Sequence, residues 1–174
     1  MTENSEMAEF SHVVVPSQVS AAGSAFLLEP TADQRAALAE RFDLVSLDAF
    51  RADLRLVPMP GGAAVLRMTG TIKARLVQRC VATLAPVEAD IEASVDIMLR
   101  PVDSLTGEID YNEDVEPYQD DKLDIGEIAA EELALALDPY PRATGAGEPG
   151  DGGRAEGTPA AGPFAALAPL RGKK

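Results

Sequence analysis

The sequence predicts an α+β fold, in which an antiparallel, strongly twisted sheet or partial barrel carries two packed helices and a flexible C-terminal tail. Three observations support this class. Apolar and polar residues alternate over long stretches of residues 44–99, as in half-buried antiparallel strands. Two segments open with helix-capping signatures, and the last thirty residues are rich in Gly, Pro and Ala. The length of 174 residues suits one domain, which we expect over residues 10–141.

The N-terminal part predicts one strand and one helix. Residues 1–9 are polar and acidic, so we expect a disordered N-terminus. The β-branched run over 10–15 ends at Pro16, which is typical of a short strand. Thr31 and Gln34 have the spacing of a capping box, and apolar residues then recur on one side, which predicts a helix over 32–42.

The central part predicts the sheet. A strand-like pattern runs over 44–57, and the turn sequence of residues 58–62 precedes a second apolar run that begins at Ala64, so we expect a β-hairpin. Further alternation follows over 71–80 and over 87–99. The polar side of the latter stretch is acidic.

The C-terminal third predicts a loop, a helix and a tail. Residues 102–123 are acidic with few apolar anchors and indicate a mobile loop. Asp124, with Glu127 three residues on, predicts the start of a helix over 125–137 that Asp138-Pro139 ends. Residues 142–174 then read as a flexible linker and a C-terminal docking segment. Its apolar side chains are Phe164, Leu167 and Leu170.

Composition excludes several classes of protein. The hydrophobic fraction of 46% is enough for a packed core, and no apolar run is long enough to span a bilayer, so we expect no membrane insertion. A single cysteine and the lack of a signal sequence predict a cytoplasmic protein. The net charge of −14 argues against wrapping of duplex DNA. That charge is uneven: residues 1–80 carry −1, residues 81–141 carry −15 and residues 142–174 carry +2.

No catalytic, metal or cofactor motif emerges, and nothing points to a small-molecule substrate. Cys80 and His12 are the only cysteine and histidine, which is too few for a structural zinc site. We interpret Cys80 as a buried, structural residue. No Gly-rich phosphate loop follows a strand, and the acidic residues lack the spacing of a calcium loop.

One constellation could carry a function. If residues 71–80 form a strand, Lys73, Arg75 and Arg79 share one side, while Ile72, Leu76 and Cys80 lie on the other. Further arginines on neighbouring strands could join them, namely Arg51, Arg55 and Arg67. The planar guanidinium group of arginine can donate hydrogen bonds to two oxygens of a phosphate at once. The acidic side of residues 88–96 could equally pair with these cations across strands, so an internal and an external use both remain open.

Several motifs resemble one bacterial protein family. The segment Val77-Gln78-Arg79-Cys80 resembles the Cys-x-Arg-Cys segment of the large ribosomal RNA subunit accumulation proteins, the YceD family. The acidic helix with its Pro-containing stop at 138–141 and the closing segment 162–167 resemble later family motifs in the same order. Val77 replaces the first cysteine, so a metal site that the family may have would be incomplete here.

The resemblance implies a non-catalytic factor for accumulation or processing of 23S ribosomal RNA and for large-subunit assembly. The leading hypothesis is a module that binds precursor 23S RNA, or an RNA–protein intermediate, through Arg67, Lys73, Arg75 and Arg79. The alternative is a protein-only adaptor or chaperone whose acidic stretch 103–132 binds a basic large-subunit ribosomal protein. The charge of −15 over 81–141 favours the adaptor more than it favours RNA binding. The oligomeric state stays open.

Overall fold

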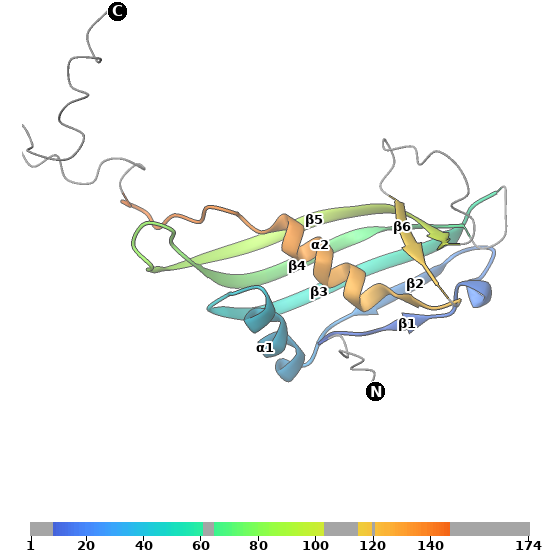
Figure 1. The fold of residues 1–174 in the computed structure, drawn as a ribbon, viewed down its shortest axis with the longest axis horizontal. Helices are drawn as coiled ribbons and strands as arrows, with labels where there is room; N and C mark the ends of the chain where they lie inside the picture. The colour runs from blue at the N-terminus through green and yellow to red at the C-terminus, as the bar shows by residue number, and fades with distance from the viewer. Residues whose placement is uncertain (1–8, 61–64, 103–114, 120, 147–174) are drawn as a thin grey trace, which may run out of the picture. The chain divides into compact units, whose positions relative to one another are not determined.

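A computed structural model describes residues 9–60, 65–102, 115–119 and 121–146 (Figure 1). The chain divides into two units, residues 1–144 and 145–174, and the elements below all lie in the first. A five-stranded sheet has the order β2-β3-β4-β5-β6, and a separate two-stranded sheet pairs β1 with β7. The five-stranded sheet is open, with β2 and β6 at its edges, and the α+β class is confirmed.

The elements have the following bounds. The strands are β1 Val13–Val14, β2 Ser24–Leu28, β3 Ser46–Pro58, β4 Leu66–Arg79, β5 Pro86–Pro101, β6 Val115–Tyr118 and β7 Leu123–Asp124. The α-helices are α1 Ala32–Arg41 and α2 Ile125–Ala136, and a short 3₁₀ helix covers Pro16–Gln18. The predicted helices over 32–42 and 125–137 are therefore confirmed to within a residue at each end.

Strands β2 to β5 form an antiparallel meander, in which each strand pairs with the next along the chain. The sequence pattern divides residues 64–80 into two stretches, but the structure has one continuous strand, β4. Gly70 explains the interruption in the pattern. A Cβ atom at Gly70 would lie 2.1 Å from the carbonyl oxygen of Asp53, so β3 and β4 approach too closely there for any side chain.

The two faces of the sheet differ in burial. The even-numbered residues of β3 from Phe50 onward and of β4 lie on a buried face, which includes Leu54, Leu56, Met68, Ile72 and Leu76. Helix α2 contacts β4 and β5, and α1 contacts β3 (Figure 1). The odd-numbered residues of β4 line the opposite face, which we call the open face. Alternation along the strands thus places the polar residues toward solvent.

Both helices begin with the predicted caps. The Thr31 side chain accepts a hydrogen bond from the backbone N–H of Gln34, and the Gln34 side chain accepts one from the N–H of Thr31. Asp124 accepts hydrogen bonds from the N–H groups of Gly126 and Glu127 at the start of α2. Its carboxylate also accepts a hydrogen bond, 2.8 Å long, from the N–H of His12, so the cap of α2 holds the N-terminal segment as well.

The structure corrects two expectations and adds a strand. The segment predicted as a mobile acidic loop over 102–123 contains β6 and part of β7, because the side chains of Tyr118 and Leu123 are buried and anchor them. Residues 103–114 and 120 of that segment lie outside the described residues. Of the strand predicted over 10–15, only Val13 and Val14 form a strand, β1, because only these two residues pair with β7. Strand β2 was not predicted.

Candidate nucleic-acid interface

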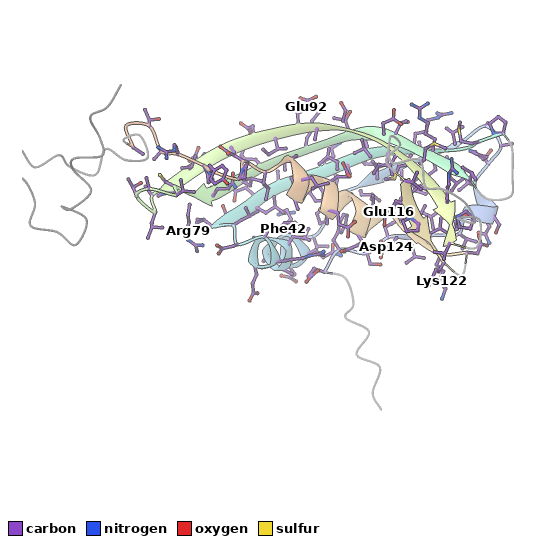
Figure 2. The ribbon with its side chains drawn as sticks, turned by 45° about the horizontal axis from the view of Figure 1, so that its top comes forward. Phe42, Arg79, Glu92, Glu116, Lys122 and Asp124 are labelled. Carbon is purple, nitrogen blue, oxygen red and sulfur yellow. The ribbon has the colours of Figure 1, made fainter. Side chains whose placement is uncertain are left out.

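The centre of the open face carries Lys73 and Arg75, which alternate on β4. Antiparallel register places Lys73 directly opposite Glu92 and Arg75 directly opposite Asp90 on β5. The Nζ–Oε1 distance of the first pair and the Nε–Oδ1 distance of the second are both 3.1 Å. Figure 2 shows Glu92 on the side of the sheet away from the helices. The predicted common side of these cations is therefore confirmed, and each of them has an acidic neighbour.

The other two predicted residues lie toward the ends of β4. Arg67 forms two hydrogen bonds to the Asp96 carboxylate, of 2.6 and 2.7 Å, which raise the pKa of Arg67 and lower that of Asp96. Arg79 lies 2.8 Å from a carboxylate oxygen of Asp43, just after α1. Arg67 and Arg79 each lie six residues from Lys73 along the extended strand, which corresponds to about 20 Å. Of the four predicted binding residues, only Lys73 and Arg75 lie next to each other on one side of the strand.

Arginines of β3 lie on the same face. Arg51 sits directly opposite Lys73 and forms ion pairs with Asp53 and Glu29. Its hydrogen bonds to Asp53 raise its pKa. Arg55 donates a hydrogen bond of 2.7 Å to the carbonyl oxygen of Ala22. We call the exposed cations of the two strands the cationic band: Arg51, Arg55, Arg67, Lys73, Arg75 and Arg79.

A groove of about 790 Å³ lies at the middle of this band, and we call it the central groove. Four cations line it, namely Arg35, Arg51, Lys73 and Arg75. Four carboxylates line it too, namely Glu29, Asp48, Asp90 and Glu92. Sequence reasoning missed Arg35 because this residue comes from α1, and only the folded chain brings the helix next to the strands.

The ion pairs of the central groove are exposed and therefore weak. The side chains of Arg75 and Asp90 are 69% and 79% exposed, and those of Lys73 and Glu92 are 58% and 67% exposed. Pairs of this kind contribute about 0–1 kcal/mol. The carboxylates can turn to solvent at little cost, which leaves the cations available to another anion. The internal pairing that the sequence left open is therefore present, and the external use of the cations stays a prediction.

Two groups of acidic side chains lie on β5 and around α2. One is the exposed row of β5, which comprises Glu88, Asp90, Glu92 and Asp96. The other lies at β6, β7 and α2, where Figure 2 shows Glu116 and Asp124. Partial burial, together with the negative charges of Glu131 and Glu132, raises the pKa of Glu116. This second group lies on the helix side of the sheet, where Lys122 and the Arg41–Glu127 ion pair are also found.

Cys80 follows β4 and is fully buried, as predicted. The backbone of Ala143 and the hydroxyl of Thr83 hydrogen-bond to the thiol and lower its pKa to about 6. Within the described part of the chain, no group of three or more His, Cys, Asp and Glu side chains is placed to hold a metal ion. None of the helices in that part is long and apolar enough to cross a membrane.

Comparison with known proteins gives one family. The family model described as large ribosomal RNA subunit accumulation protein YceD matches residues 68–171. No match was found among curated proteins or among solved structures. The matched span contains Lys73, Arg75 and Arg79, whereas Arg35 and Arg51 precede it.

Proposed function

Because the chain belongs to the YceD family of large ribosomal RNA subunit accumulation proteins, we propose that it is a non-catalytic ribosome-biogenesis factor. It supports the accumulation or processing of 23S ribosomal RNA and assembly of the large subunit by binding precursor RNA or an RNA–protein intermediate.

The observation that carries this proposal is the cationic band on the exposed face of β3 and β4. Five of its six cations are arginines, whose planar fork can bond two phosphate oxygens at once. An RNA phosphate would replace an exposed carboxylate as the partner of Arg75 or Lys73. Since the original pairs contribute little, the exchange costs little, and release of counterions from the RNA favours binding.

The test is a double charge reversal at the centre of the band, Lys73→Glu with Arg75→Glu. Loss of two single-strand phosphate contacts should flatten the log–log salt dependence of RNA binding by about 1.4 units, at about 0.7 per contact. Melting temperature is measured on the same protein. A folded variant with an unchanged salt slope would rule out phosphate contact at these positions.

A charge swap provides the matched control, because Lys73 and Glu92 face each other directly. The variant with both Lys73→Glu and Glu92→Lys keeps the pair and the net charge. It should melt like the wild type and still bind RNA less tightly, since the cation has moved from β4 to β5. Full RNA affinity in the swapped protein would mean that the position of the cation is irrelevant.

A second function is supported by the acidic surfaces. The exposed row of β5 and the group around Glu116 could bind a basic large-subunit ribosomal protein and keep it soluble until assembly. Recovery of partners with a tagged chain, with and without ribonuclease, separates the two functions. RNA-dependent recovery supports the first, and ribonuclease-resistant recovery of one basic protein supports the second.

A further inference from the structure

We infer that the central groove takes the phosphate backbone of single-stranded RNA without reading its bases, and that Arg35 is a further contact residue. This inference rests on the proposed function. It adds the class of RNA, the mode of recognition and a residue that lies outside the span matched by the family model.

Arg35 differs from the other cations of the groove. Arg51, Lys73 and Arg75 each have a carboxylate partner, but Arg35 forms no ion pair among the residues that the structure describes. Its Nη1 donates a hydrogen bond of 2.8 Å to the carbonyl oxygen of Pro30, which fixes the guanidinium. Its Nε is buried and has no acceptor within the same described ranges. Buried donors normally have acceptors, so the Arg35 guanidinium keeps an unused donor at the wall of the groove. The carboxylate of Asp48 lines the same groove.

The other three cations of the groove lie at neighbouring positions of β3 and β4. Lys73 and Arg75 are alternate residues of one strand, about 6.6 to 6.8 Å apart along it, and Arg51 faces Lys73 at about 4.8 Å across the sheet. The step along β4 is of the order of the distance between neighbouring phosphates in an extended strand. A single RNA backbone that runs along β4 could therefore place successive phosphates next to Lys73 and Arg75. Arg35 would contact the same backbone from α1.

The described part of the open face lacks aromatic side chains on which bases could stack. The odd-numbered residues of β4, the exposed residues of β3 and the acidic row of β5 include no aromatic side chain. Sheets that read single-stranded RNA stack its bases on aromatic rings. We therefore expect the main contacts to be those of the cations with phosphate, which carries no sequence information.

A duplex fits this arrangement poorly. Duplex-binding domains contact grooves and phosphates spread over many base pairs. In the central groove Arg51, Lys73 and Arg75 occupy neighbouring positions of two paired strands, and the acidic row of β5 flanks them. A second RNA strand would approach that acidic row and be repelled.

The experiment measures binding of the full-length chain to labelled 12-nucleotide oligo(U) and oligo(A), and to a 12-base-pair RNA duplex, by fluorescence anisotropy over a salt series. We expect the two single strands to bind within about threefold of each other and the duplex to bind at least tenfold more weakly. Arg35→Gln should weaken single-strand binding five- to tenfold and flatten its salt slope by about 0.7.

The matched control is Lys122→Gln, which removes one positive charge on the helix side of the sheet (Figure 2). It should leave both affinity and slope within twofold of the wild type. Circular dichroism establishes that both variants are folded. Arg35→Met, which keeps a long side chain without its charge, serves as a second variant if Arg35→Gln does not fold.

The outcomes separate the two proposals. Failure of every RNA to bind overturns the proposed function itself. RNA binding that favours the duplex, or that differs more than tenfold between the two oligonucleotides, overturns only the inference about the class of RNA. Equal effects of Arg35→Gln and Lys122→Gln overturn the role of Arg35.

Discussion

At the scale of single residues, Cys80 combines full burial with hydrogen bonds that favour its thiolate. The folded state lowers the pKa of the thiol from 9.0 to about 6. A group with a lowered pKa contributes stability that is complete above its unfolded pKa and is lost as the pH falls through its folded pKa. The contribution of Cys80 to the free energy of unfolding should therefore grow between pH 6 and pH 9.

We predict that Cys80→Ala costs about 1 kcal/mol or slightly more near pH 6, from lost packing, and a larger amount at pH 8.5. Urea denaturation at the two pH values measures the difference. Thr83→Val, which removes a hydroxyl donor to the thiol, should reduce the pH dependence of the wild-type protein. RNA binding by the folded Cys80→Ala protein should be unchanged. An equal cost at both pH values would contradict the role of the thiolate.

At the scale of the elements, Asp124 joins three parts of the fold. It pairs with Val13 in the β1–β7 sheet, caps α2 and accepts a hydrogen bond from the N–H of His12. Gly126 lies close by: a Cβ atom there would be 2.7 Å from the nitrogen of His12. The start of α2 and the N-terminal segment thus pack backbone against backbone.

We predict that Asp124→Ala destabilises the protein by about 1–2 kcal/mol, because it leaves N–H groups of α2 without an acceptor. Asp124→Asn should recover much of that loss, since asparagine is also a good N-cap residue. Thermal unfolding of the two variants gives the comparison. An alanine variant as stable as the asparagine variant would show that the cap is dispensable.

The elements that sequence patterns predict are those with local causes. Alternation along β3, β4 and β5 and the caps of both helices depend on neighbours in the chain, and all were predicted. The same alternation predicted that Lys73 and Arg75 lie on one side of β4. Strands β6 and β7 are acidic and short, and they form only because β5 and β1 offer them partners. The partner of Arg79 and the place of Arg35 likewise depend on tertiary structure.

At the scale of the whole chain, the unit that ends at residue 144 holds the core, and the predicted docking segment with Phe164, Leu167 and Leu170 lies outside the described residues. We propose that this segment docks on a partner. Removal of residues 160–174 should then leave the melting temperature nearly unchanged and weaken partner recovery. A clear fall in melting temperature would mean that the segment stabilises its own chain instead.

The pairing of β1 with β7 leads us to expect an order of folding. Asp124 and His12 are 112 residues apart, whereas β2 to β5 each pair with the next strand along the chain. Contacts between distant residues form late, because the loop between them must close first. The chain is synthesised from its N-terminal side, so β2 to β5 can pair before the residues of β7 have been made. We therefore expect Val13 and Val14 to pair after the meander has formed, although they precede it in the chain.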